Sequence, residues 1–280
     1  MNRTMITAQN TLTQLQKQMD IVSHNMANID TTGYKRREAS FTDLLFQQFN
    51  NQTLPQLETN RLTPNGIRQG VGAKLAQSQM VGSQGSVKTT ERSLDFAFTT
   101  EGQYFKVLEQ GENGSSIRYT RDGAFYLTPL SPNETMLVTG SGHPVLDENN
   151  NPITINGPIK EFSLQDNGRV LVSMNNGSTV EFNLGVVQVK KSQFFEQKGE
   201  NLLGLPENFA ELNTSMDEIL TELNGPLRNQ IAIQQGALEQ SNVDMSKEMP
   251  ELITLQRAYQ FQSRSISIAD QMMGLINGIR

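Results

Sequence analysis

The sequence predicts an α+β fold in which helices at both ends of the chain pair as a coiled coil around a central all-β domain. Near both termini, apolar residues recur at alternating steps of three and four, which is the heptad spacing of paired helices. In the middle, short runs of alternating apolar and polar residues are separated by Asn-Gly turns. The 280 residues suffice for one large or two ordinary domains.

We expect four parts along the chain. Residues 1–34 and 243–280 together form a terminal helical domain, and residues 69–205 form a β-rich domain. Residues 35–68 form an extended linker, because the stretch 46–68 is polar and contains two prolines. Residues 206–242 form a second linker with a short amphipathic helix and a return strand.

The N-terminal segment, from about Thr4 to Asn28, has the composition of a helix, rich in Gln, Leu and Met and free of Gly and Pro. A cluster of turn-forming residues that ends in Gly33 stops it. Its apolar positions follow steps of 3, 4, 3, 4 and 3: Leu12, Leu15, Met19, Val22, Met26 and Ile29. At ~1.5 Å per residue the helix would be about 37 Å long, so its own short neighbours cannot cover it.

The C-terminal segment carries a second seam with the same spacing. Pro250 precedes the seam, which predicts either a fresh helix start or a kink at that point. The seam residues are Leu252, Leu255, Tyr259, Gln262, Ile266, Ala269, Met273 and Ile276. Two seams of similar length at opposite ends of one chain predict a coiled coil, whose register the polar Gln262 would help to set.

The middle of the chain, about residues 69–201, reads as a set of short strands. Turn signals such as DNG at Asp166–Gly168 and NNG at Asn175–Gly177 separate alternating runs such as RVLVSM. After it, residues 208–223 predict one short amphipathic helix, closed by Asn224, Gly225 and Pro226. Its apolar positions are Leu212, Met216, Ile219, Leu220 and Leu223.

Composition excludes several classes of partner. A net charge of −6 argues against nucleic acid, whose phosphates require a basic face. The absence of cysteine excludes disulfides and thiolate metal sites. No apolar run approaches the ~20 residues of a membrane span, so we expect no direct membrane insertion. The N-terminus lacks a continuous apolar core, so we expect no cleaved signal peptide.

No pattern of residues points to an enzyme, a cofactor or a metal. The two histidines, His24 and His143, are far apart and have different surroundings. The stretch DENNNP, from Asp147, resembles the start of a calcium loop, but Pro152 and Pro158 stand where that motif needs Gly and Glu. We therefore expect no catalytic, cofactor-binding or metal-binding residues. A wall hydrolase fused to such helices would need an added domain, and the sequence offers none.

The terminal seams have two interpretations. They could form an ordinary helical hairpin within one chain, built only for stability. Assembly with other chains is favoured because apolar residues also lie beside the seams, where a two-helix hairpin leaves them uncovered. These flanking residues are Ile6, Ile21, Leu44, Leu45, Ile253, Ile268, Met272 and Leu275.

The terminal stretches QMDIVSHNMANIDTTGYKRREASFTDLL and GALEQSNVDMSKEMPELITLQRAYQFQSRSISIADQMM closely resemble the paired signatures of the flagellar rod, hook and hook–basal-body proteins. In the middle, LDFAFTTEGQYFKV, YTRDGAFYLT, VTGSGHPVLDENNNPITI and LGVVQV are similar to the distal-rod branch. The resemblance covers nearly the whole chain and departs from the family pattern over residues 206–235. The branch is therefore less closely specified than the family.

The resemblance implies a structural subunit without enzymatic activity. Such a subunit leaves the cell through the flagellar type III export apparatus, without a cleaved signal, and joins the basal body outside the cytoplasmic membrane. Its partners would be copies of itself and other axial proteins of the rod and hook, joined through the terminal helices into a tube. An alternative is a coupling or cap protein that docks on the axial structure without polymerising.

The resemblance also singles out individual residues. The signature turn that leaves the N-terminal helix corresponds to Asn25, Asn28, Thr32, Gly33 and Tyr34. Gly33 would supply a backbone conformation closed to other residues, or a simple helix C-cap, or both. Within FTDLL, the pair Phe41 and Leu45 is similar to the short export-gate motif of rod and hook substrates, although a packing role would explain the same spacing.

Overall fold

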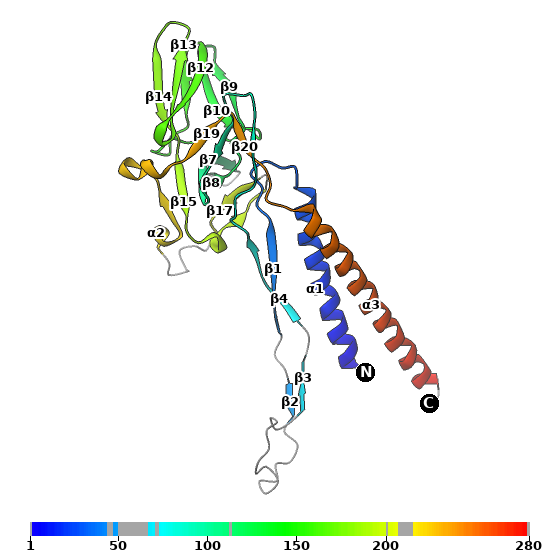
Figure 1. Cartoon of the computed structure of the whole chain (residues 1–280). Helices are drawn as coiled ribbons and strands as arrows, with labels where there is room; N and C mark the ends of the chain where they lie inside the picture. Colours follow the sequence, from blue (N-terminus) through cyan, green and yellow to red (C-terminus); the bar gives the residue numbers. More distant parts are fainter. Residues whose placement is uncertain are drawn as a thin grey trace. The chain divides into compact units, whose positions relative to one another are not determined.

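The computed structural model describes residues 2–43, 47–49, 67–70, 73–111, 114–199, 201–206 and 215–278. The fold is α+β, as predicted: helix α1 (Asn2–Ala27), a mostly β centre and helix α3 (Met245–Gly278) (Figure 1). The chain divides into two compact units. The helical unit comprises residues 1–26, 37–79 and 245–280, and the β unit comprises residues 27–36 and 80–244. Of the β-rich stretch expected over residues 69–205, residues 69–79 fall in the helical unit and residues 80–205 in the β unit.

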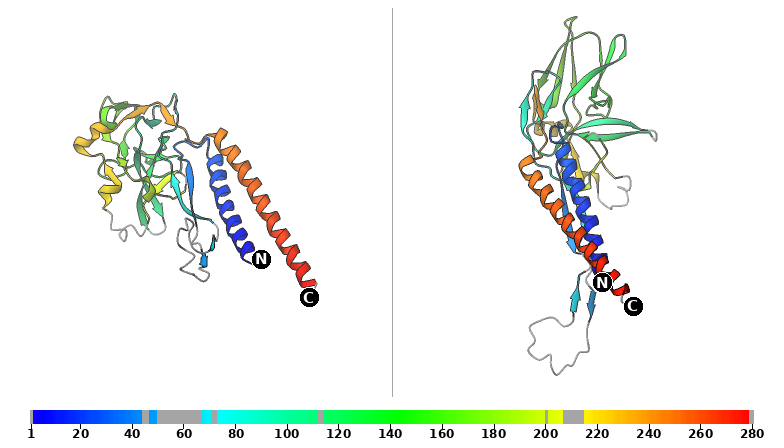
Figure 2. Two further views of the ribbon diagram at one scale, coloured as in Figure 1. Left: turned by 60° about the horizontal axis from the view of Figure 1, so that its bottom comes forward. Right: turned by 90° about the vertical axis from the view of Figure 1, so that its right-hand side faces the viewer.

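Helices α1 and α3 are each continuous (Figure 2). In α1, the hydroxyls of Thr11 and Thr13 donate to carbonyls one turn earlier, so these β-branched polar residues are accommodated within the helix. Helix α3 begins at Met245, so Pro250 is neither its start nor its first turn. The Thr254 hydroxyl donates to the Pro250 carbonyl at 2.8 Å.

Strands of the helical unit occupy part of the segment expected to be a linker. Strand β1 (Arg37–Asp43) pairs with β4 (Ala73–Met80), and β2 (Gln47–Phe49) pairs with β3 (Ile67–Gln69). Their mostly polar sequences lack the alternation of apolar and polar residues that predicts a half-buried strand. Helix α1 supports this ribbon, because the Leu75 backbone N–H donates to Gln14 Oε1 at 2.8 Å.

The β unit is organised around a six-stranded antiparallel sheet. Its strand order is β16 (Glu196–Gln197), β17 (Leu202–Gly204), β8 (Gly114–Thr120), β7 (Gln103–Gly111), β15 (Val186–Val189) and β18 (Leu220–Glu222). In the register of the centre, Phe105 lies opposite Thr120 on one side and Val186 on the other.

Four smaller sheets complete the β unit. One joins β11 (Thr154–Asn156), β10 (Glu134–Thr139) and β9 (Phe125–Ser131), and another joins β12 (Ile159–Gln165), β13 (Arg169–Met174) and β14 (Thr179–Asn183). Two pairs join β19 (Ile233–Gln235) to β6 (Phe96–Phe98) and β20 (Ala237–Glu239) to β5 (Val87–Thr89). Short 3₁₀ turns lie at Asp166–Gly168, Ser192–Phe194 and Gly225–Gln230.

The hairpin turns predicted from Asn-Gly pairs are confirmed. DNG lies between β12 and β13, with Asn167 and Gly168 at φ values of 65° and 69°. NNG lies between β13 and β14, with Gly177 at φ 82°. Positive φ at these positions matches the twist that antiparallel strands require of a tight turn.

The amphipathic helix predicted over residues 208–223 is confirmed at Met216–Ile219 and wrong from Leu220 onward. The described part forms one turn, α2 (Met216–Ile219), and then strand β18, in which Leu220 lies opposite Val189. Ile219 and Leu220 are both buried, at 0% and 3% exposure, and the change to a strand buries both of these adjacent residues. Leu212 lies outside the described residues.

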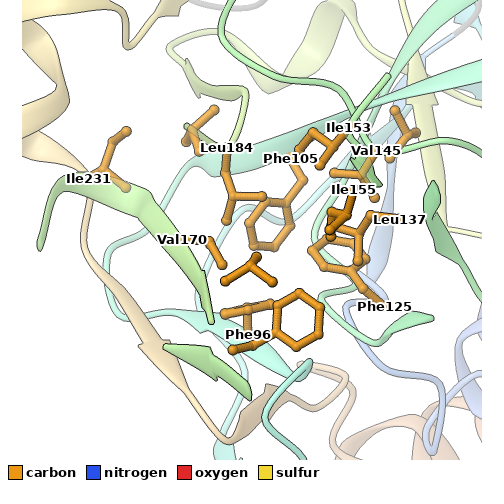
Figure 3. Packing of buried hydrophobic residues seen from close by; sticks show 14 of the residues in the cluster. Phe96, Phe105, Phe125, Leu137, Val145, Ile153, Ile155, Val170, Leu184 and Ile231 are labelled. Atoms are coloured by element: carbon orange, nitrogen blue, oxygen red, sulfur yellow. The ribbon is translucent and has the colours of Figure 1, made fainter. Parts of the chain in front are cut away.

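Both faces of the six-stranded sheet are covered. Successive residues of a strand point to opposite faces, so Phe105 and Val186 enter one core while Tyr104 and Val187 enter another. Figure 3 shows Phe96, Phe105 and Phe125 gathered with aliphatic residues in the larger core. The Phe105 ring meets the Phe125 ring edge-on, with centroids 5.1 Å apart.

Replacing the central ring, Phe105→Ala, should lower the free energy of unfolding by about 3–5 kcal/mol, through lost burial and the cavity left behind. Leu130→Ala is the matched control, because Leu130 is 54% exposed and its loss should cost less than about 0.5 kcal/mol. Urea unfolding followed by circular dichroism measures both. Equal costs for the two variants would contradict this account of the core.

Candidate functional site

The turn that follows α1 is fixed by a glycine that no other residue can replace without strain. Gly33 has φ +68°, and a Cβ built there would lie 2.5 Å from the Asp122 backbone nitrogen. Its own N–H donates to the Glu239 carbonyl at 2.9 Å. Gly33 lies six residues beyond Ala27, the last residue of α1, so it is not in the helix C-cap position.

Polar side chains hold the same turn against the β unit's own loops. The Thr32 hydroxyl donates to Asp122 Oδ1 at 2.9 Å, and Asn201 Nδ2 donates to the Thr32 carbonyl at 2.7 Å. The Ala124 N–H also donates to Asp122 Oδ1. Burial raises the pKa of the Asp122 carboxyl, and these two hydrogen bonds oppose that rise.

Directly after the turn lies a buried ion-pair cluster made by Lys35, Arg121 and Glu239. Lys35 Nζ is 2.6 Å from Glu239 Oε1, and Arg121 Nε is 2.5 Å from Glu239 Oε2. All three side chains are at most 4% exposed. Burial lowers the pKa of Lys35, and the Glu239 carboxylate opposes this shift.

Each of the three guanidinium nitrogens of Arg121 donates a hydrogen bond. Besides Glu239, it donates to the Gln103 carbonyl at 2.7 Å and to the Thr100 carbonyl at 2.8 Å. Its guanidinium carbon lies 5.7 Å from the centre of the Tyr104 ring. Burial raises the pKa of Tyr104 to about 12, so this phenol remains neutral beside the cluster.

Asn242 clamps the chain where it returns toward α3. Its Oδ1 accepts the Arg36 N–H at 2.6 Å, and its Nδ2 donates to the Val81 and Ser83 carbonyls, each at 3.0 Å. One side chain therefore joins the outgoing segment, the start of the β-rich stretch and the returning segment.

In the helical unit, the Asn25 side chain likewise joins segments that are distant in the sequence. It accepts the Arg37 N–H through Oδ1 at 3.0 Å and donates to the Arg37 carbonyl through Nδ2 at 2.9 Å. Its Nδ2 also lies 3.2 Å from Glu248 Oε2 on α3. A second bond joins the helices, from Gln18 Nε2 to Glu251 Oε1 at 3.0 Å.

The predicted seam residues differ in exposure along each helix. Val22, Leu255 and Ala269 are buried, whereas Ile276 is 52% exposed. The remaining seam residues are partly buried: Leu12, Leu15, Met19, Met26, Ile29, Leu252, Tyr259, Gln262, Ile266 and Met273. Ile29 lies two residues beyond Ala27, the last residue of α1, so the helical part of the predicted N-terminal seam ends at Met26.

Beside the seam of α3, large apolar side chains are open to solvent. Their exposures are high: Ile253 43%, Phe261 72%, Ile268 55%, Met272 46% and Leu275 69%. On α1, Ile6 is 52% exposed, while Ile21 is partly buried. Phe41 lies on β1 and is 39% exposed, whereas Leu44 and Leu45 lie outside the described residues.

Three family models match this chain. A model described as "Flagella basal body rod protein" matches residues 5–35, "Flagellar hook protein FlgE/F/G D1 domain" matches 100–172, and "Flagellar basal body rod FlgEFG protein C-terminal" matches 234–279. The flagellar hook–basal body complex protein FlhP of Bacillus subtilis (strain 168) is 45% identical over the whole length of both chains. The chain belongs to the flagellar rod and hook–basal body protein family.

Two further relatives are less similar to this chain. The flagellar basal-body rod protein FlgG of Borreliella burgdorferi is 32% identical over 100% of this chain and 99% of its own. FlgG of Bacillus subtilis (strain 168) is 29% identical over 92% of this chain and 91% of its own. These names describe structural components of the flagellar basal body.

In this flagellar protein, residues that the sequence patterns did not single out lie against the signature turn. Lys35, Arg121 and Glu239 were missed because they lie far apart in the sequence, and only the fold brings them within bonding distance. Asn242 was missed for the same reason, since two of its partners, Val81 and Ser83, are about 160 residues away. The available signal was a charged residue beside a turn glycine or an aromatic, as in GYKR and YTRDG.

Neither His24 nor His143 belongs to a cluster of possible metal ligands among the residues that the structure describes. Over the described residues, no three His, Cys, Asp or Glu side chains gather closely enough to hold a metal ion. In the same part of the chain, no helix has both the length and the hydropathy needed to span a membrane.

Gly33→Ala should destabilise the β unit of this flagellar protein by more than 1 kcal/mol, because it adds a backbone clash to the ~1 kcal/mol cost of a left-handed alanine. Gly177→Ala is the control, since Gly177 has φ +82° but open space around its Cβ. Thermal unfolding of both variants separates the two costs. A Gly177 variant as unstable as the Gly33 variant would contradict the close approach to Asp122.

Proposed function

We propose that this protein is a structural subunit of the bacterial flagellar rod and hook–basal body, exported by the flagellar type III system and polymerising through its terminal helices. The observation that carries the proposal is the row of exposed apolar side chains on α3, in a chain that belongs to this family. A helix that keeps Phe261 and Leu275 about 70% exposed calls for a partner to cover them.

Pairing of α1 with α3 is part of the proposal. Hydrogen bonds between the helices join residue 25 to 248 and residue 18 to 251. The bonded residue nearer the start of α1 pairs with the one farther along α3, so the two helices run antiparallel. The two heptad seams would then face each other, and the flanking rows would remain for neighbouring subunits.

Neighbouring copies would meet through different surfaces of the helices. A contact between unlike surfaces builds a ring where its rotation closes and an open helical filament where it does not, and the proposal requires the second case. The flanking apolar residues on α3 and the many Gln and Ser residues between them suit such a contact, since most of this surface can be packed against without burying charge.

The names of the relatives support a proposal for the position of this chain within the axial structure. In Bacillus subtilis (strain 168), the chain is 45% identical to the hook–basal body complex protein FlhP and 29% identical to the rod protein FlgG. We therefore assign it a place of the FlhP kind, within the hook–basal body complex, in preference to the place of FlgG.

Ile268→Gln combined with Leu275→Gln should abolish assembly, because both side chains are more than half exposed in the free chain and would be buried in the polymer. The folded subunit should lose less than about 0.5 kcal/mol of stability per substitution. Motility and electron microscopy of basal bodies, in a strain whose own gene is replaced, measure the effect.

Leu130→Gln on β9, at a side chain 54% exposed in the β unit, is the control and should leave motility intact. Complete, rotating flagella with the α3 double variant would overturn polymerisation through α3. The alternative, a protein that docks without polymerising, would then replace it.

Export through the short gate motif is a separate expectation. Phe41 is already 39% exposed on β1, so Phe41→Ala should lower secretion of the protein several-fold without unfolding the β unit. Thr42→Ala, at the adjacent exposed position, is the control. Immunoblots of secreted and cellular fractions measure the ratio. Equal secretion of both variants and the wild type would remove Phe41 from the motif.

A further inference from the structure

The buried cluster in the β unit draws its charges from three distant parts of the chain. Glu239 is separated from Lys35 by 204 residues and from Arg121 by 118. We propose that Glu239 is a folding latch: the β unit acquires its native packing only when strand β20 places this carboxylate between Arg121 and Lys35. This role holds whether or not the chain is exported as proposed above.

Charge balance makes Glu239 indispensable. Among the described residues, it is the only carboxylate within ion-pair distance of either Lys35 or Arg121. The other partners of these two cations are neutral carbonyl oxygens, those of Ser83, Gln103 and Thr100. Without Glu239, two like charges would lie close together in a site almost closed to water, which is strongly unfavourable.

The same residue closes the structure through its other polar atoms. Its carbonyl accepts the Gly33 N–H at 2.9 Å, and its Oε1 accepts the Gly85 N–H at 2.9 Å in addition to Lys35. Glu239 therefore joins the segment leaving α1, the segment before β5 at Gly85 and the residues that follow β8 at Arg121. No other buried carboxylate among the described residues pairs with two buried cations.

Apolar packing does not provide an equivalent attachment for β20. The strand has only three residues, and Ala237 is its one fully buried apolar side chain, while Leu238 is partly buried. Its partner β5 is exposed along its length. A short strand with so little apolar burial depends on its polar contacts to remain in place.

The test compares Glu239→Gln with Glu218→Gln in the full-length chain. Gln keeps the size of the side chain and removes its charge. Glu218 pairs with Lys191 at 3.1 Å, but these side chains are 60% and 42% exposed, so its loss should change little. Amide hydrogen exchange followed by mass spectrometry reports on β7 and β13, which lie in the core and contain none of the substituted residues.

We expect Glu239→Gln to reduce the protection of β7 and β13 amides from exchange by at least about 100-fold. Removing one partner of a buried pair destabilises the whole of a unit that unfolds cooperatively. Glu218→Gln should leave this protection unchanged. Loss of protection confined to β5 and β20 would overturn the latch, since Glu239 would then hold only its own strand.

A second variant separates charge from a simple failure to fold. Adding Lys35→Met to Glu239→Gln removes one of the two facing cations. The amides of β7 and β13 should then be at least about tenfold better protected from exchange than in Glu239→Gln alone. A double variant as poorly protected as Glu239→Gln alone would overturn charge balance as the cause.

Discussion

The structure of the β unit depends on the buried Glu239 carboxylate that faces Lys35 and Arg121. These groups lie where the chain leaves α1 and where it returns toward α3, so both passages are fixed by one ion-pair cluster. Desolvated charges are tolerated only when they are paired and hydrogen-bonded, and here each has such partners. Gly33, Thr32 and Asn242 hold the adjoining backbone in the geometry that the cluster requires.

A sheet covered on both faces explains why the β unit draws on distant segments. The larger core on one face of the six-stranded sheet takes Leu223 and Ile231 from beyond residue 205, and the core on the other face takes Ile219 and Leu220. A domain limited to residues 69–205 would leave these apolar surfaces open. The return strands are therefore part of the fold of the β unit, and under the proposed function the late residues of the exported chain would complete it.

The helical unit contrasts with this closed packing. Its strands pair two by two, an arrangement that is only marginally stable by itself, and the helices keep large apolar side chains in solvent. In the proposed assembly, neighbouring subunits would bury these residues. Under this proposal, the buried cores of the β unit stabilise the subunit, and the exposed apolar residues of the helical unit attach it to its partners.

The sequence by itself determined the features whose causes are local. Heptad spacing predicted α1 and α3, and the Asn-Gly pairs at residues 167–168 and 176–177 predicted hairpins, because helix periodicity and left-handed turns are encoded within a few residues. Only the tertiary structure decided the rest. Strands β1 and β4 have no alternation to mark them, and β18 forms where a helix was predicted because it pairs with β15. The Lys35–Glu239–Arg121 cluster could not be predicted from the sequence, since ion pairs between residues more than 100 positions apart leave no local pattern.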